Sequence, residues 1–312
     1  MNISRKKHLT KNKTTFQYIK SDMQLYIMLL PFLLFYIIFV YKPMWGLQAA
    51  FRDYNMFKGM AESPWVGLDN FNAVFKSPYF GRILRNTLLI STYSLLFSFP
   101  MPIILALLLN EVRSTKYKSF IQTCTYLPHF ISTVVVAGMV TSFLAPSTGI
   151  VNIILSKLGF EKIYFLSKPE YFRTIFITQG IWQGAGYSSI VYIAALSGID
   201  MALYEAAKID GCGRWKQTLH ITLPGLLPTI VMIFIINVGN ILNVGYEKII
   251  LLYQPATYET ADVISTYVYR MGIENADYGI STAIGLFNSV VGFIFVFTAN
   301  TLSNKINGMG LW

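Results

Sequence analysis

Six long stretches of the chain are apolar and contain no Asp, Glu, Lys or Arg. Each has about 19 or more residues, which is the length that a helix needs to cross the hydrocarbon core of a bilayer. The strands of a membrane barrel would instead alternate in polarity over about 10 residues. The pattern therefore predicts an all-α polytopic membrane protein with six transmembrane helices: Met23–Tyr41, Leu88–Leu109, Phe120–Ala145, Ile175–Ile199, Leu226–Val244 and Ile280–Leu302.

The composition agrees with this class. Hydrophobic residues make up 54% of the 312 residues and charged residues 13%, whereas soluble domains carry about 25% charge. The same values exclude an intrinsically disordered chain. The net charge is +10, but no DNA- or RNA-binding motif accompanies it and the positive charges lie mainly beside the spans. They indicate contact with membrane lipid and no nucleic-acid partner.

Loop charge predicts the orientation. With a cytoplasmic N-terminus, the inside segments are shorter than the outside segments and denser in Lys and Arg, as the positive-inside rule requires. The first apolar run is longer than a signal-peptide core and no small-x-small cleavage site follows it, which favours a retained helix. Both termini are therefore predicted to be cytoplasmic: a basic N-terminus at 1–22, a transmembrane domain at 23–302 and a C-terminus at 303–312.

The inside segment 200–225 predicts two short helices joined by a bend. Asp200 can cap the first helix, and Gly211 supplies a bend that a residue with a side chain would resist. An apolar stripe that starts at Trp215 recurs every four residues along the second helix. Pro224 is expected to start the fifth span, where its missing N–H costs little. Such an element between two spans predicts a docking site for a soluble partner.

Residues 200–225 resemble the EAA loop of the membrane subunits of bacterial ABC importers. The match consists of Glu205-Ala206-Ala207, Gly211 and Ile221-x-Leu223-Pro224 in the expected loop. Other segments resemble carbohydrate permeases of this type: Gly67–Phe71, Arg85–Leu88, Tyr126–His129, Gly149–Asn152 and Tyr192–Leu196. The C-terminal Gly308–Trp312 resembles that of permeases that import complex oligosaccharides. By resemblance the chain is identified as the inner-membrane permease of a type I ABC importer for a carbohydrate.

The resemblance implies an assembly in the bacterial plasma membrane. A second homologous permease, giving a heterodimer, would complete the translocation path for an oligosaccharide. Two cytoplasmic ATPase subunits would bind ATP and Mg, and an extracellular substrate-binding protein would deliver the sugar. The chain itself would then bind no cofactor and would not be an enzyme. ATP-driven closure of the ATPases would bring the coupling loops together and open the path outward.

The resemblance also assigns roles within the EAA loop. Glu205 would make polar contacts to the ATPase, Ala206 and Ala207 would allow close approach, and Gly211 would set the bend. The predicted coupling residues are Glu205, Ala206, Ala207, Asp210, Gly211, Leu223 and Pro224.

No catalytic or metal site is found in the sequence. A G-x-x-x-x-G-K-[ST] phosphate loop is absent. The three histidines, His8, His129 and His220, lack the spacing of metal ligands. His129 lies within the third span, where it either packs against a neighbouring helix or lines a cavity, and packing is favoured.

Asparagines recur every three residues in the fifth span and predict a polar face. Asn237, Asn240 and Asn243 cover about 120° of a helix, and Glu247 continues the stripe. Two interpretations stay open: the wall of a sugar pathway, or hydrogen bonds to another helix. Weaker candidates for the pathway are Asn288, Trp182, Gln183 and Tyr187, and the glycines nearby, Gly180, Gly184 and Gly186, are more typical of close helix packing.

Three alternatives remain. An ABC permease for a non-sugar solute would carry the same coupling loop, although the lack of charge in the spans argues against a dedicated site for a charged substrate. A membrane enzyme would place acidic or histidine pairs within the spans, and none occurs there. A secondary transporter would leave the EAA loop unexplained and would show an inverted repeat, which is not evident.

Overall fold

A computed structural model describes residues 22–308, 310 and 311, so the predicted N-terminal segment 1–22 lies outside it except for Asp22. Helices dominate the described part, which contains no strand; one antiparallel bridge joins Arg52 and Trp65. The all-α prediction is therefore confirmed. Four helical segments in this part are long and apolar enough to cross a bilayer, and two bent helix pairs raise the number to six.

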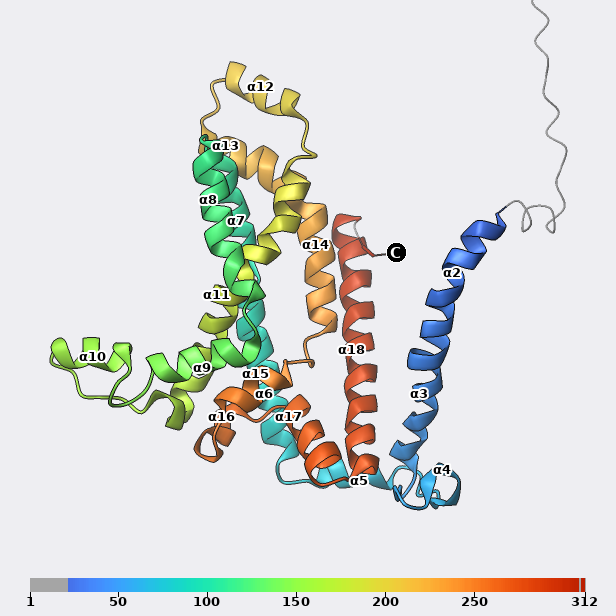
Figure 1. Cartoon of the computed structure of the whole chain (residues 1–312). Helices are drawn as coiled ribbons and strands as arrows, with labels where there is room; N and C mark the ends of the chain where they lie inside the picture. Colours follow the sequence, from blue (N-terminus) through green and yellow to red (C-terminus); the bar gives the residue numbers. More distant parts are fainter. Residues whose placement is uncertain (1–21, 309, 312) are drawn as a thin grey trace, which may run out of the picture.

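The six predicted spans correspond to six helical segments (Figure 1). The first contains α2 (Met23–Phe35), η1 (Tyr36–Tyr41), α3 (Lys42–Met44) and η2 (Trp45–Phe51), and the second contains α6 (Phe80–Tyr93), η3 (Ser94–Ser98) and α7 (Pro100–Glu111). The third contains α8 (Thr115–Tyr126), η4 (Leu127–Phe130) and α9 (Thr133–Phe143), and the fourth is α11 (Pro169–Leu196). The fifth contains α13 (Arg214–Gln217), η6 (Thr218–Thr222) and α14 (Leu223–Gly239), and the sixth is α18 (Tyr278–Asn307).

Shorter helices connect these segments. They are α4 (Gly59–Glu62), α5 (Asp69–Lys76), α10 (Ile150–Lys157), η5 (Phe165–Ser167), α12 (Met201–Ile209), α15 (Tyr246–Leu252), η7 (Pro255–Thr257), α16 (Tyr258–Ala261), α17 (Ile264–Tyr269) and η8 (Arg270–Glu274). α5 packs on α18 and η2, and the amide of Asn70 donates hydrogen bonds to the carbonyls of Ala50 and Arg52. The loop between the first two spans is therefore a packed cap.

The third span is not the straight helix that its apolar run predicts. α8 and α9 meet at an angle of 98°, and α9 runs sideways from the bundle in Figure 1. Pro128 cannot donate a backbone hydrogen bond, which weakens a helix at that point. Ser132 then caps a new helix, since its side chain accepts a hydrogen bond from the N–H of Val135. Hydropathy counts apolar residues and does not detect such a change of direction.

The fifth span begins and ends earlier than predicted. Its helix runs without a break from Arg214, so Pro224 lies inside a helix and does not start one. The π-helical turn Thr218–Thr222 ends two residues before this proline, and such a turn can accommodate the missing N–H. The same helix ends at Gly239, and Val244 lies beyond it.

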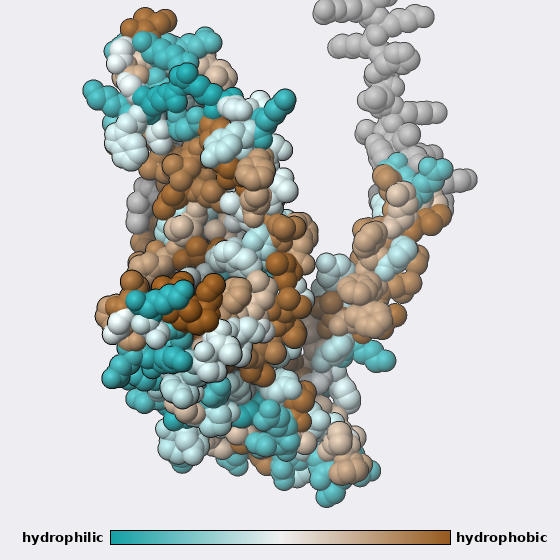
Figure 2. All heavy atoms as spheres, turned by 60° about the vertical axis from the view of Figure 1, so that its left-hand side comes forward, coloured by the Kyte–Doolittle hydropathy of each residue, from teal (hydrophilic) through white to brown (hydrophobic). Residues whose placement is uncertain are grey.

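The two ends of the described chain lie on the same side of the bundle. In Figure 1 the start of α2 and the end of α18 point toward the end of the molecule that α12 forms, and α2 stands apart from the other spans. No residue of α2 is buried. Figure 2 shows hydrophobic side chains along α2 and over the middle of the bundle, with hydrophilic ones gathered toward both ends. This distribution suits a bilayer; the cytoplasmic location of the termini stays a prediction.

Close packing of α8 against α11 depends on Gly186, as the sequence predicts for glycines of the fourth span. A Cβ at Gly186 would overlap the backbone carbonyl of Thr125, whereas a Cβ at Gly184 would meet nothing within 4 Å. Gly186 therefore allows the close approach, and Gly184 does not serve this purpose.

Replacing Gly186 by Ala should destabilise the protein by about 1–3 kcal/mol, since the added methyl group forces the two helices apart. The midpoint of thermal unfolding in lipid nanodiscs measures this effect. Gly184→Ala, on the same helix, is the matched control. Equal midpoints for the two variants would contradict the close approach of α8 and α11.

Candidate functional site

The predicted coupling segment forms a separate lobe at one end of the molecule, with α12 at its tip (Figure 1). α12 begins after Asp200, whose carboxylate accepts a hydrogen bond from the N–H of Ala202 at 2.9 Å, which confirms the predicted cap. Gly211 has a φ of +74°, a conformation that favours glycine. The predicted bend is therefore present, although the helix that follows it is the start of the fifth span.

Two contacts join α12 and the start of the fifth span to the rest of the bundle. The hydroxyls of Tyr204 and Thr222 lie 3.0 Å apart and join α12 to the fifth span. Arg214, at the start of that span, pairs with Glu111 at the end of the second span over 3.3 Å. The lobe is thus supported from two spans.

The outer surface of the lobe combines apolar and polar groups. Ile209 is 87% exposed and Trp215 is 79% exposed, which is typical of a docking surface. Glu205, Ala206 and Asp210 are exposed beside them, Ala207 and Leu223 are half-buried, and Pro224 is exposed on the fifth span. Their roles in coupling stay predictions.

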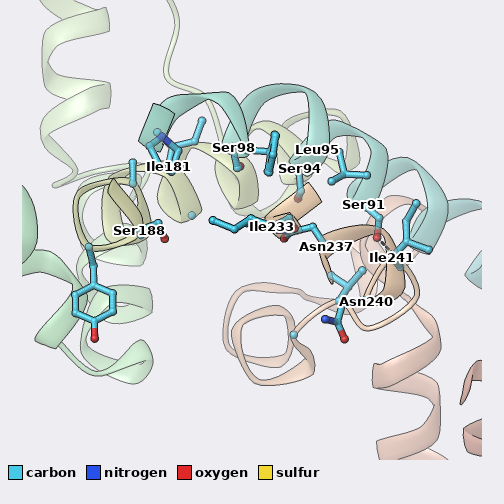
Figure 3. Close-up of a pocket in the computed structure, with 18 of the residues that line it drawn as sticks. Ser91, Ser94, Leu95, Ser98, Ile181, Ser188, Ile233, Asn237, Asn240 and Ile241 are labelled. Atoms are coloured by element: carbon cyan, nitrogen blue, oxygen red, sulfur yellow. Dashed lines mark hydrogen bonds between the residues drawn. The ribbon is translucent and has the colours of Figure 1, made fainter. Parts of the chain in front are cut away.

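A cavity of about 650 Å³ lies between the second span, α11 and α14 (Figure 3). Ser91, Ser94 and Ser98 face it from the second span, and Ser188 lines it from α11. The asparagines of the fifth-span region and apolar residues complete its lining: Leu95, Phe99, Pro102, Phe176, Gly180, Ile181, Gly184, Ala185, Tyr187, Val191, Tyr192, Ile233, Asn237, Asn240, Ile241, Asn243, Val244 and Gly245. Hydroxyl and amide groups beside apolar surface match the hydroxyls and ring faces of a sugar.

The three predicted asparagines line this cavity, but they do not form one helical stripe. Asn237 and Asn240 donate to the carbonyls of Ile233 at 2.8 Å and Ile236 at 3.1 Å. Asn243 lies beyond α14, because the helix ends at Gly239. The prediction of a helix through Asn243 is therefore wrong, yet the turn after α14 still brings Asn243 to the cavity.

Glu247 does not continue the asparagine stripe. It lies on α15 and is exposed, because the break after Gly239 starts a new helix with a different direction. Glu247 is not among the residues that line the cavity, so its predicted continuation of the stripe is wrong.

The four weaker candidates for the sugar pathway lie in different surroundings. Tyr187 lines the cavity, and its ring stacks on His129 with centroids 3.9 Å apart, so His129 packs as the sequence analysis favours. Asn288 on α18 donates to the side chain of Asn243 at 2.6 Å, a hydrogen bond between elements of the same chain. Gln183 donates to the carbonyl of Ile131 at the break in the third span, over 3.1 Å, and Trp182 lines a different, apolar cavity of about 390 Å³.

Sequence reasoning missed the serines of this site. Ser91, Ser94 and Ser98 recur at spacings of three and four residues, so they share one face of the second span. This spacing was a usable signal within an otherwise apolar run. Ser188 is followed by Ser189, which is buried, and two adjacent serines give no comparable periodic signal.

Lys248 of α15 is a half-buried cation close to the cavity, and its position has no signal in the sequence. Its ammonium group donates to the carbonyl of Phe176 and lies 3.9 Å from the centroid of the Phe176 ring. Burial lowers the pKa of Lys248 to about 7, because the charged form loses its hydration. In the described part of the chain no carboxylate forms an ion pair with it.

Solved structures and a curated relative resemble the chain over nearly its whole length. The crystal structure of a bacterial ABC transporter involved in the import of the acidic polysaccharide alginate contains a chain that is 53% identical, with a TM-score of 0.87 over 94% of this chain and 99% of that one. A crystal structure of the bacterial alginate ABC transporter, in complex with an alginate pentasaccharide-bound periplasmic protein, contains a chain that is 52% identical. Its TM-score is 0.88 over 96% of this chain and 100% of that one. The polygalacturonan/rhamnogalacturonan transport system permease protein YteP of Bacillus subtilis (strain 168) is 43% identical over 92% of this chain and 90% of its own length.

The apolar helical segments place the chain among multi-pass membrane proteins. Residues 98–308 match the family of binding-protein-dependent transport system inner membrane components. The chain belongs to that family. Its ABC importer permease fold and its location in the inner membrane, both predicted from the sequence, are thereby confirmed.

Proposed function

We propose that this chain forms one part of the translocation path for an oligosaccharide in an ATP-driven importer. The observation that supports this proposal most strongly is the cavity, where serine and asparagine side chains gather between membrane spans. Such groups bind sugar hydroxyls, and a polar recess of this kind between membrane spans would have little purpose in a purely structural helix interface. The relatives named for alginate and polygalacturonan/rhamnogalacturonan transport support a carbohydrate substrate over another solute.

The assembly that we propose contains four further components. A second, homologous permease would close the open side of the cavity in a heterodimer. Two ATPase subunits would bind ATP and Mg in the cytoplasm and contact the α12 lobe, and the chain itself would bind no cofactor. An extracellular binding protein would deliver the sugar; the alginate transporter in complex with its ligand-bound periplasmic protein supports this part.

Coupling would pass through the α12 lobe. Closure of the ATPases would move the exposed surface around Glu205 and Trp215, and the contacts to the second and fifth spans would transmit this movement to helices that line the cavity. Alternating access follows if ATP binds one of two conformations better than the other.

Removing single polar groups from the cavity should weaken sugar uptake without preventing it. In proteoliposomes that contain the whole complex, Ser94→Val or Asn237→Leu should raise the KM for the transported oligosaccharide about 2- to 10-fold, since one hydrogen bond contributes about 0.5–1.5 kcal/mol. Ser119→Val changes an exposed serine of α8 that is not among the cavity residues. This control should keep the wild-type KM, and equal KM values for all three variants would contradict the proposed path.

A further inference from the structure

Lys248 is not itself among the residues that line the cavity, but its ammonium group packs directly against two that are. Its nitrogen is 3.2 Å from the position that a Cβ on Gly180 would occupy. Gly180 and Phe176, the two α11 residues that it approaches, both line the cavity, as do Val244 and Gly245 just before α15. The absence of a side chain at Gly180 leaves the space in which the ammonium group sits.

The charge of Lys248 is not compensated by a carboxylate in the described part of the chain, unlike that of Arg270. Arg270, which is also largely buried, forms two hydrogen bonds to the carboxylate of Asp262. Lys248 instead has a carbonyl and an aromatic face as its named partners in the described structure. A desolvated cation without an opposite charge is unfavourable, so an anion from outside the chain would stabilise the charged form of Lys248.

We propose that Lys248 is the counter-charge for a carboxylate of the transported sugar, which makes the substrate class an acidic, uronate-containing oligosaccharide. The inference rests on the proposed function of the cavity and specifies its substrate. A carboxylate that reaches Lys248 favours the charged form of the lysine and forms a charge-assisted hydrogen bond with it. The serines and asparagines of the cavity would bind the hydroxyls of the same sugar. The acidic polysaccharide named for a solved relative is in agreement with this class.

The experiment compares acidic sugars with their neutral forms. Oligogalacturonates and alginate oligosaccharides are offered to proteoliposomes that contain the whole complex and its binding protein, beside their methyl esters, which keep size and shape but lose the charge. A panel of neutral plant oligosaccharides is measured in parallel. Uptake of an acidic sugar by the wild type should exceed uptake of its ester. Lys248→Met should raise the KM for the acidic sugar about tenfold or more, because a hydrogen bond to a charged group is lost.

Three further variants separate the effect of the Lys248 charge from a general structural effect of substitution. Lys248→Arg keeps the positive charge and should retain the preference for the acid. Lys157→Met removes an exposed lysine of α10 and should leave the KM unchanged. Gly180→Ala places a methyl group against the flexible end of the Lys248 side chain, so the helix should tolerate it while the KM for the acidic sugar rises.

The outcomes distinguish this inference from the proposed function. Uptake of neutral oligosaccharides only, or an acid preference that survives in Lys248→Met, would overturn the role of Lys248 and leave an oligosaccharide permease. Failure to transport any oligosaccharide, acidic or neutral, while the assembled complex hydrolyses ATP would overturn both.

Discussion

Glu205→Ala should abolish most of the substrate-stimulated ATP hydrolysis of the assembled complex. Glu205 is exposed on α12, at the tip of the lobe that we propose as the contact with the ATPase. Truncating one partner of a desolvated charge pair at an interface costs about 2–5 kcal/mol, so stimulation by the binding protein and sugar should fall at least about tenfold. The measurement is the ATPase rate in lipid nanodiscs, with and without the sugar-loaded binding protein.

A matched control separates coupling from a general effect of charge. Glu161→Ala removes another exposed carboxylate, in the loop after α10, and should keep the stimulated rate. Size-exclusion chromatography must show that the Glu205→Ala complex stays assembled. A normal stimulated rate in that assembled variant would mean that Glu205 does not carry the coupling contact.

Arg270→Met should destabilise the protein by about 3–5 kcal/mol, because it leaves a buried carboxylate without its cation. The side chain of Asp262 is completely buried. It accepts hydrogen bonds from Arg270 at 2.9 Å and 2.8 Å and from Thr266 at 2.8 Å, while Arg82 is farther away at 3.9 Å. Burial alone would lower the pKa of Arg270, but the hydrogen bonds and charge of Asp262 raise it above its ordinary value.

The double variant makes this prediction specific. Asp262→Asn combined with Arg270→Met removes both charges, so much of the lost stability should return. The midpoint of thermal unfolding in nanodiscs follows all three variants. If the single variant Arg270→Met were as stable as the wild type, Asp262 and Arg270 would not form the stabilising buried ion pair described here.

The spans could be predicted from sequence because the bilayer imposes a simple rule. Charges are excluded from the hydrocarbon core, so every predicted run overlaps a helical segment. The directions and ends of the helices could not be predicted from the exclusion of charge. The 98° bend of the third span and the end of the fifth span at Gly239 depend on local backbone chemistry. Pro128 and Ser132 carried a signal for the first of these, and the pair Gly239-Asn240 carried one for the end of α14, since glycine and asparagine commonly end helices.

The two candidate sites differ in how far they could be foreseen. The α12 lobe is local in sequence, so a motif with its cap at Asp200 and its bend at Gly211 was sufficient. The cavity combines distant segments, and only its asparagines and Tyr187 were candidates beforehand. Lys248 shows most clearly what could not be predicted from the sequence. The spans carry no charge, which argued against a site for a charged substrate, but the fold brings a lysine from a loop to α11 beside the cavity.

The most direct test of the central claim is the ATPase rate of the purified complex in nanodiscs, with its binding protein, against a panel of solutes. The panel contains neutral and acidic oligosaccharides, amino acids and phosphate. We expect an oligosaccharide to stimulate hydrolysis, and amino acids and phosphate to leave it at its basal rate. Stimulation by an amino acid or phosphate, with no response to any oligosaccharide, would contradict a carbohydrate path through this chain.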